Sequence, residues 1–387
     1  MRVFAGVLGA LLLLLVFADA FQTIILPRRS TGRYRLTQLF YMLTWTPWSW
    51  VAQKIQAPRR RESWLSFFGP LSLVLLIVLW AAFLVIGFGL FFYAAGSPFT
   101  DALQQHASTV GTDLYVSGTT LFTLGLGDVV PRSLIVRVLL VLEAGTGLGF
   151  VAMVIGYFPV LYGAFSRREV DISLLDARAG SPPTAAELMR RHSTEDGIVA
   201  LDTLLQDWER WAAELLESHI SYPLLCYFRS QHTNQSWLSA LCAVLDTCAL
   251  MVATLKKLPS RQAELTFAMA RHAVVDLAQI FDLEPAELKA DRLTATDFSQ
   301  LHDLLCQAGT SVARDDKSLN RLNEMRALYE PYGEALSRHL NTAIPPFLAA
   351  TPSRNNWQTV AAVRKATQEA AEKEGVIFAI EDDHHSL

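Results

Sequence analysis

Three long apolar runs dominate the first half of the chain. They cover roughly Val3–Leu26, Gly69–Ala94 and Leu134–Phe165. Each run is long enough to cross a bilayer as a helix, which takes about 20 apolar residues. The pattern therefore predicts three transmembrane helices, with a more polar segment at 95–133 between the second and the third.

The second half of the chain has helical periodicity instead of long apolar runs. A Gly-Ser-Pro-Pro turn at 180–183 precedes Thr184, and Glu187 follows three residues later, which matches a helix-capping box. Apolar residues such as Leu238, Leu241 and Leu245 then recur at helical spacing. The pattern predicts an all-α domain with helices at Thr184–His192, Asp196–His219, Gln235–Lys257, Ser260–Phe281, Pro285–Lys289, Ala295–Gln307, Lys317–Leu340 and Asn356–Glu374.

The charge is divided unevenly between the two halves. The chain of 387 residues has a net charge of −4, and residues 165–387 carry 22 Lys and Arg against 31 Asp and Glu. This acidic balance argues against a nucleic-acid partner. The cysteines have no metal-site spacing, so we expect four reduced, buried thiols at Cys226, Cys242, Cys248 and Cys306.

Loop charges predict the orientation in the membrane. The segment 27–63 holds eight Lys and Arg and a single acid, Glu62, so it should face the cytoplasm. The segment 95–133 holds Asp101, Asp113 and Asp128 but only one basic residue, so it should lie outside. Cleavage after a signal peptide at residues 18–20 would invert both loops. We therefore expect three spans of the inner (plasma) membrane, with the N terminus outside and the C-terminal domain inside.

Tryptophans gather in the basic segment at Trp45, Trp48 and Trp50, with Trp64 soon after. Because tryptophan favours the headgroup layer, residues 36–56 could form a helix on the inner membrane face. They could equally form a loop packed on the protein. Both interpretations remain open at this point.

The polar segment between the second and third spans contains Thr123-Leu124-Gly125-Leu126-Gly127-Asp128. This stretch resembles the selectivity-filter signature of the potassium-channel family, T-[V/I/L]-G-[Y/F/L]-G-D. In such a filter, rings of backbone carbonyls replace the water of a dehydrated cation. The resemblance implies K⁺ sites at the carbonyls of Thr123, Leu124, Gly125 and Leu126 and at the Thr123 hydroxyl. It also implies that Gly127 turns the chain outward and that Asp128 braces the filter against a pore helix.

The residues before the motif predict that pore helix. Thr112 is a suitable N-cap for a helix over Asp113–Phe122, and Asp113 suits its positive end. The motif departs from the family at Phe122, where many members have a second threonine, and at Leu126, which replaces Tyr or Phe. A phenol that could tie the filter to its surroundings is therefore absent, and the pore helix has no tryptophan. These departures leave a non-selective cation channel as the alternative.

The third apolar run contains two further candidates, Glu143 and Gly147. The resemblance places Gly147 where the family's inner helix has its gating hinge, whereas a membrane glycine can also serve close packing. Glu143 could accept hydrogen bonds behind the filter, face the pore, or be a structural carboxyl near the outer interface. These alternatives remain open.

A single filter motif implies assembly. The family's pore needs four pore loops and this chain supplies one, so the resemblance implies a homotetramer. The first span lacks regularly spaced arginines, so it should pack outside the pore and not act as a voltage sensor. We expect a first span at 1–26, a basic cytoplasmic or interfacial linker at 27–63, a pore domain at 64–165, a linker at 166–183, a helical domain at 184–375 and a flexible tail at 376–387.

The sequence of the helical domain does not identify a ligand. Two helical pairs could be metal half-sites, His272 with Asp276 and His302 with Cys306. The sequence shows no glycine-rich nucleotide loop, no catalytic arrangement and no cofactor signal. We therefore expect no enzyme but a passive channel in the lipid bilayer, with K⁺ as permeant ion and an unspecified cytoplasmic ligand or protein partner. An alternative of another class is a non-conducting scaffold or sensor whose helical domain binds a partner.

Overall fold

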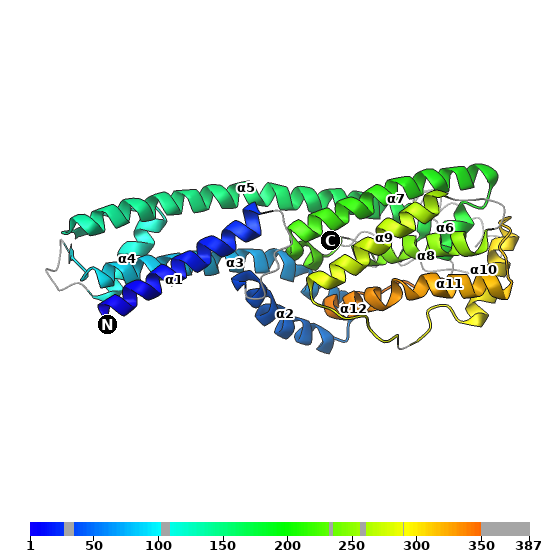
Figure 1. Ribbon diagram of the computed structural model, residues 1–387, viewed down its shortest axis with the longest axis horizontal. Coiled ribbons are helices and arrows are strands. Elements are labelled where there is room, and N and C mark those ends of the chain that lie inside the picture. Colours follow the sequence, from blue (N-terminus) through cyan, green and yellow to red (C-terminus); the bar gives the residue numbers. More distant parts are fainter. Residues whose placement is uncertain (27–34, 102–108, 232–234, 256–260, 289, 350–387) are drawn as a thin grey trace, which may run out of the picture.

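The computed structural model describes residues 1–26, 35–101, 109–231, 235–255, 261–288 and 290–349. Its helices form two groups along one long axis (Figure 1). One group contains α1 (Arg2–Ala20), α3 (Pro58–Ala94), α4 (Val110–Leu121) and the first part of α5 (Leu134–Ala179). The other contains the helices that follow α5. The predicted fold class, an all-α membrane protein with a helical C-terminal domain, is confirmed.

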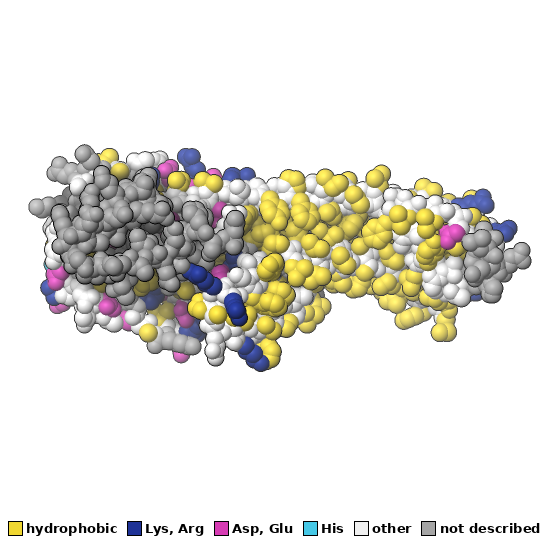
Figure 2. Space-filling model, turned by 180° about the vertical axis from the view of Figure 1, so that it is seen from behind, with side chains coloured by type: hydrophobic (Ala, Val, Ile, Leu, Met, Phe, Trp, Pro, Cys, Tyr) yellow, Lys and Arg dark blue, Asp and Glu magenta, His cyan; other side chains and the backbone are white. Residues whose placement is uncertain are grey.

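Four of the described helices are long and apolar enough to cross a membrane, at Arg2–Ile25, Pro58–Ala94, Leu134–Ala179 and Trp237–Thr254. The fourth, α8 (Trp237–Thr254), has 94% of its apolar window buried inside the protein. A helix that is apolar all round is either a span or a core helix, and this burial identifies α8 as a core helix. The other three are the predicted spans, and apolar side chains gather on this half of the molecule on the face that Figure 2 shows.

The first span packs against the second through small residues. A Cβ atom on Gly9 would lie 2.7 Å from the Gly87 carbonyl oxygen, so the two backbones nearly touch. Near the other end of α1, the buried Asp19 carboxylate accepts hydrogen bonds from Trp80 Nε1 at 2.9 Å and Thr37 Oγ1 at 2.6 Å. These donors satisfy a carboxylate at membrane depth. After α1 the chain continues as a π-helical turn, η1 (Phe21–Ile25).

The tryptophan-rich segment forms the helix α2 (Leu36–Lys54). Its buried face carries Tyr41 and Trp45, which pack on the protein. Its other face leaves Met42, Leu43 and Trp50 more than half exposed, at 59%, 62% and 57%. One face is thus packed on the protein, and contact of the other face with lipid remains a prediction.

The helix α5 is longer than the predicted third span. It passes Phe165 without a break and includes residues 166–179, where we expected a linker. Ile172, Leu175 and Ala179 are buried there against the helical domain, which explains why the segment stays helical. The helix ends at Gly180, whose φ of +83° no other residue adopts easily. One helix therefore joins the filter region to the helical domain.

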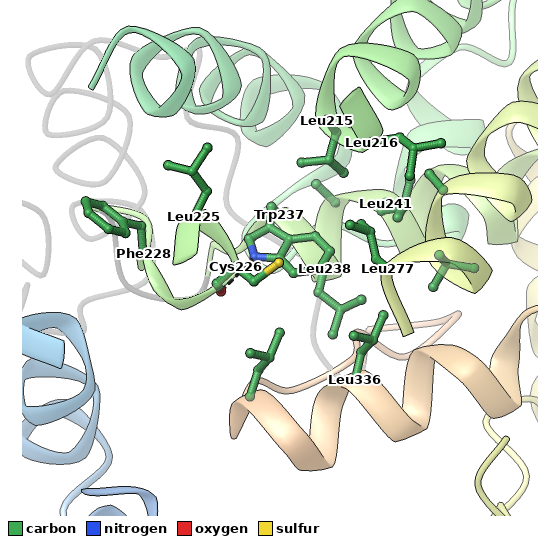
Figure 3. Close-up of a cluster of buried hydrophobic side chains, with 14 of the residues drawn as sticks. Leu215, Leu216, Leu225, Cys226, Phe228, Trp237, Leu238, Leu241, Leu277 and Leu336 are labelled. Carbon is green, nitrogen blue, oxygen red and sulfur yellow. Dashed lines mark hydrogen bonds between the residues drawn. The ribbon is translucent and has the colours of Figure 1, made fainter. Parts of the chain in front are cut away.

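The helical domain surrounds α8. Leu238 and Leu241 of α8 face Leu215, Leu277 and other apolar side chains of neighbouring helices (Figure 3). The surrounding elements are α6 (Ala185–Arg191), α7 (Glu195–Ser221), the 3₁₀ turn η2 (Pro223–Tyr227), α9 (Arg261–Ile280), α10 (Ala295–Gln307), α11 (Asp316–Ala327) and α12 (Glu330–Leu340).

Several predicted helices differ from those observed. The chain at 285–288 is not helical, so the helix predicted at Pro285–Lys289 is wrong. The helix predicted at Lys317–Leu340 is two helices, and Pro331 lies in the first turn of the second, where a missing N–H costs nothing. The helix predicted at Asn356–Glu374 and the tail at 376–387 lie outside the described residues.

Of the two hydrogen bonds that the predicted capping box at α6 requires, one is present. Thr184 Oγ1 accepts the Glu187 backbone N–H at 3.3 Å, as expected. The Glu187 carboxylate, however, accepts from Arg190 at 2.7 Å and from Arg191 at 2.6 Å. These charge-assisted bonds are stronger than a bond to a neutral N–H, which explains why the carboxylate turns away from the cap.

A buried ionic network fixes the other side of the domain. Asp246 of α8, which is fully buried, accepts from Arg292 at 2.6 Å, and Arg292 also contacts Glu330 at 2.9 Å. Arg326 contacts the same glutamate at 3.1 Å. The network holds the irregular segment before α10 against α8 and α12. Each buried charge has an opposite partner, as burial requires.

Candidate functional site

The predicted pore helix is α4, and its N-terminus differs from our expectation. The cap is Thr109, not Thr112, and the helix begins at Val110. Thr109 Oγ1 accepts the Thr112 N–H at 3.4 Å, while Thr112 Oγ1 accepts the Thr109 N–H at 3.3 Å. A reciprocal capping box of this kind pairs two backbone donors. Asp113, which we placed at the positive helix end, is buried and accepts from Ser97 Oγ at 2.5 Å.

After α4 the backbone adopts an alternating conformation through the filter motif. Thr123, Gly125 and Gly127 have positive φ angles of 56°, 52° and 76°, whereas Leu124 and Leu126 between them do not. Alternation of this kind turns successive peptide groups toward one side. The Thr119 carbonyl of α4 accepts the Leu124 N–H at 2.7 Å and so ties the start of the motif to the pore helix.

The filter motif is uncovered in a single copy of the chain. Leu124 and Leu126 are 62% and 63% exposed, and Phe122 before them is 54% exposed. A Cβ atom on Gly125 or Gly127 would meet nothing within 4 Å. Non-helical backbone with apolar side chains at membrane depth requires burial in protein or a wet cavity. Among the described residues of one copy, nothing provides such burial for Leu124 and Leu126.

The outer end of the motif is braced from two directions. Tyr115 of α4 donates its phenol hydroxyl to Asp128 Oδ2 at 2.8 Å. Just beyond, β2 (Val129–Pro131) pairs antiparallel with β1 (Phe99–Asp101), with Phe99 opposite Pro131. The expectation that no phenol ties the filter to its surroundings is therefore wrong. The sequence signal we missed is a tyrosine thirteen residues before the aspartate, on the pore helix.

Glu143 lies behind the pore helix and is fully buried. Its Oε1 atom accepts from Ser117 of α4, and Ser117 Oγ also lies 2.9 Å from the Val85 carbonyl oxygen of α3. Its Oε2 atom has no partner among the described residues. Of the alternatives left open for Glu143, this position corresponds to hydrogen bonding behind the filter.

Gly147 lies against the end of the pore helix. A Cβ atom there would lie 1.9 Å from the Leu121 carbonyl oxygen and 2.8 Å from the Leu121 carbonyl carbon. The inner helix therefore approaches α4 as closely as its backbone allows. This contact shows close packing at Gly147, and the helix α5 passes through it without a break. A hinge at Gly147 remains a prediction.

Hydrogen bonds join the helical domain to α5 just after the C-terminal end of the predicted span. The buried Arg168 guanidinium donates to the Leu225 carbonyl at 3.0 Å and to the Phe228 carbonyl at 2.8 Å. The Nε2 atom of His219 in α7 lies 3.1 Å from Arg168 Nη1. Burial and the positive charge of Arg168 hold the pKa of His219 well below its usual range, so this imidazole is neutral. Sequence reasoning gave no signal for this junction.

An aromatic cluster joins α2, α3 and the helical domain. The Tyr227 ring stacks on Tyr41 at 5.5 Å between centroids and lies 4.8 Å from Trp45 and 5.3 Å from Phe68. Trp45 Nε1 donates to the His339 carbonyl at 2.9 Å. Burial lowers the pKa of His339 to about 4. The helices α2 and α3 thus both contact the domain.

The remaining candidates of the helical domain form no larger site. His272 Nε2 lies 3.5 Å from Asp276 Oδ2, and His302 Nε2 lies 3.6 Å from Cys306 Sγ. Across the described ranges no group of three or more metal-ligating side chains occurs. All four cysteines are free thiols, but Cys306 is exposed, contrary to our expectation that all four would be buried.

Comparison with known proteins agrees with this geometry. Residues 75–161 match a family model described as an ion channel. The Bacillus subtilis (strain 168) protein titled "Uncharacterized membrane protein YdjJ" is 23% identical over 200 residues, which cover 51% of this chain and 57% of that relative. The alignment thus spans little more than half of the relative's length. No solved structure matches the chain. The match at 75–161 confirms the resemblance to potassium-channel-like subunits, because it includes the filter motif and the helices around it.

Proposed function

We propose that four copies of this chain form a passive K⁺ channel whose filter consists of residues 123–128 of each copy. The ion-channel match and the apolar spans support a membrane channel. The single observation that carries the proposal is the filter backbone, where positive φ alternates at Thr123, Gly125 and Gly127 on an uncovered surface. Three further copies would cover that surface and complete rings of carbonyl oxygens around one axis.

The selectivity for K⁺ rests on how firmly the filter is held. The Tyr115–Asp128 bond at 2.8 Å and the Thr119 carbonyl support a braced filter. Phe122 and Leu126 support the alternative, a non-selective cation channel, because neither supplies a polar group to the bracing. In both the K⁺-selective and the non-selective channel, the cation would bind at the carbonyls of Thr123, Leu124, Gly125 and Leu126.

The helical domain would assemble or gate the tetramer. This role is supported by the unbroken helix α5, whose 46 residues span roughly 70 Å at 1.5 Å per residue. It is also supported by Arg168, which bonds α5 to two carbonyls of the domain. Movement of the domain would therefore act directly on the helix that carries Gly147.

The proposed orientation is supported by the charge of the loops and by the position of the N-terminal residues. Arg2 lies beside Gly96, close to the strands that flank the filter, so the N terminus shares the filter's side of the membrane. Lys54 ends α2, and Arg59 and Arg60 lie in the first turn of α3. Their neighbours Gln53 and Glu62 contact the helical domain, at Asn341 and Arg229. Positive charge marks the cytoplasmic side, so we place the domain inside the cell, with the chain in the plasma (inner) membrane.

Ion flux from liposomes tests the proposal. Full-length protein should collapse a K⁺ gradient far faster than a Na⁺ gradient. Gly125→Ala should abolish this flux, because its φ of +52° costs about 1–2 kcal/mol for a residue with a Cβ atom in each copy. Gly156→Ala is the matched control, because its Cβ atom would meet nothing within 4 Å in a helix.

The other outcomes select between the alternatives. Equal K⁺ and Na⁺ rates would favour the non-selective channel. Absence of any flux from correctly folded protein would contradict the channel and favour a membrane scaffold whose helical domain binds a protein partner.

A further inference from the structure

A cleft of about 770 Å³ opens in the helical domain where the last turn of α5 meets α6 and α7. Figure 1 shows α6 near the end of the molecule far from the filter, with α7 running from that end back toward the middle. The cleft has the size of a small-molecule site, which typically measures about 300–1,000 Å³. Its wall combines small apolar groups with basic side chains, and the polar lining residues are Arg178, Arg190, Arg191, His192, Thr203 and Asp207.

The positive charge of the cleft stands against the acidic background of residues 165–387. Arg190 and Arg191 both contact the Glu187 carboxylate, at 2.7 Å and 2.6 Å. The lining residues of the cleft include three arginines, Arg178, Arg190 and Arg191. Asp207 of α7 is the acid among the lining residues, and it lies on the opposite wall from α6.

Arg178 adds a third guanidinium from the end of α5. It makes no hydrogen bond or ion pair with the rest of the described chain, although it lines the cleft. Arg191 is held beside it, because it donates to the Ala177 carbonyl of the same helix turn. A guanidinium without an ion-pair partner can offer two parallel N–H groups to an oxyanion, and phosphate is one of the two anions that this geometry matches.

His192 reports the potential inside the cleft. Its Nδ1 atom lies 2.8 Å from the Leu188 carbonyl oxygen, which favours the tautomer with hydrogen on Nδ1. Burial lowers the pKa of His192, and the charges of Arg178 and Arg191 lower it further. The guanidinium groups of Arg178 and Arg191 thus act on His192 in the same direction. A bound anion would raise the pKa of His192. The protonated imidazole would then donate a hydrogen bond from Nε2 as well.

We propose that this cleft binds a small phosphorylated anion, held by Arg178 of α5 and by Arg190 and His192 of the α6 wall. The site lies at the end of the helix that lines the pore in the proposed function. An anion that bridges α5 and α6 would fix the angle at Gly180, where α5 ends. Regulation of the channel by this ligand rests on the proposed function, whereas the binding itself does not.

Titration calorimetry with inorganic pyrophosphate as probe tests the binding on the full-length protein in detergent. The wild-type protein should bind pyrophosphate saturably. Arg178→Ala should weaken binding by about tenfold to a hundredfold, the loss expected for one charge-assisted contact. It should leave the unfolding midpoint unchanged, because Arg178 makes no ion pair. The matched control is Arg271→Ala, an exposed arginine of α9 away from the cleft, which should bind like wild type.

Three results would overturn the site: no saturable binding, equal affinity in the Arg178→Ala and wild-type proteins, or equal weakening in the Arg271→Ala control. Sulfate at matched ionic strength that binds as tightly as pyrophosphate would assign the effect to general charge and would also overturn it. In flux assays, pyrophosphate should change K⁺ flux of wild type and not of Arg178→Ala. A protein that binds pyrophosphate but conducts nothing would contradict the proposed channel and leave the anion site standing.

Discussion

Replacing Gly147 with alanine tests whether the inner helix positions the end of the pore helix. The added Cβ atom would lie 1.9 Å from the Leu121 carbonyl oxygen, whereas such contacts are essentially never closer than 3.0 Å. Either α5 or α4 must therefore shift by about 1 Å in an interior that packs like a crystal. Overpacking of this kind typically costs about 1–3 kcal/mol in each copy. Leu121 is only two residues before Thr123, so the shift reaches the filter.

The assay compares Gly147→Ala with Gly149→Ala in the same helix. At Gly149 a Cβ atom meets nothing within 4 Å, and alanine in a helix is favoured over glycine by about 1 kcal/mol. We expect Gly147→Ala to lower both the unfolding temperature and the K⁺ flux, and Gly149→Ala to lower neither. A Gly147→Ala protein with normal stability and lost flux would refute the packing argument and favour a gating hinge.

Three other perturbations follow from contacts of the site and its junction. Tyr115→Phe removes only the hydroxyl that donates to Asp128 at 2.8 Å, a bond worth about 1 kcal/mol. The ratio of K⁺ to Na⁺ flux should therefore fall, with a drop of only a few degrees in the unfolding temperature. An unchanged ratio would show that the bond does not hold the filter. Arg168→Met leaves two buried carbonyls without their donor, which should cost about 1–3 kcal/mol for each in thermal unfolding, and a variant as stable as wild type would contradict the junction. His339 has its pKa lowered to about 4 by burial, so the unfolded chain takes up a proton below about pH 6.5 that the folded chain resists. Stability should therefore fall as the pH falls from 6.5 toward 4, with a shallower slope in His339→Gln; identical slopes would remove His339 from the explanation.

Much of the fold could be predicted from the sequence because its signals are local. A bilayer span needs about 20 apolar residues in succession, and α1 and α3 show this directly. The filter motif was equally visible, because its alternating positive φ angles require glycine at Gly125 and Gly127. The helix predicted at Gln235–Lys257 corresponds to α8, and its burial in the structure identifies it as a core helix.

The parts that sequence reasoning missed join residues far apart in the chain. Arg168 is an ordinary charged residue after a span until the fold brings it to carbonyls 57 and 60 residues away. Nothing local distinguishes Gly147, which touches Leu121, from Gly149, which touches nothing. The cap of α4 was misplaced for a simpler reason. Thr109 and Thr112 are both good caps, and only their mutual hydrogen bonds show which begins the helix.

The most direct test of the central claim is an experimental density map of the full-length protein in K⁺. The account predicts a tetramer with ion density on its fourfold axis, ringed by the carbonyls of Thr123, Leu124, Gly125 and Leu126. The density should be lost when K⁺ is replaced by a cation that the filter rejects. A monomer, or a tetramer in which residues 123–127 of the four copies lie away from the axis, would contradict it.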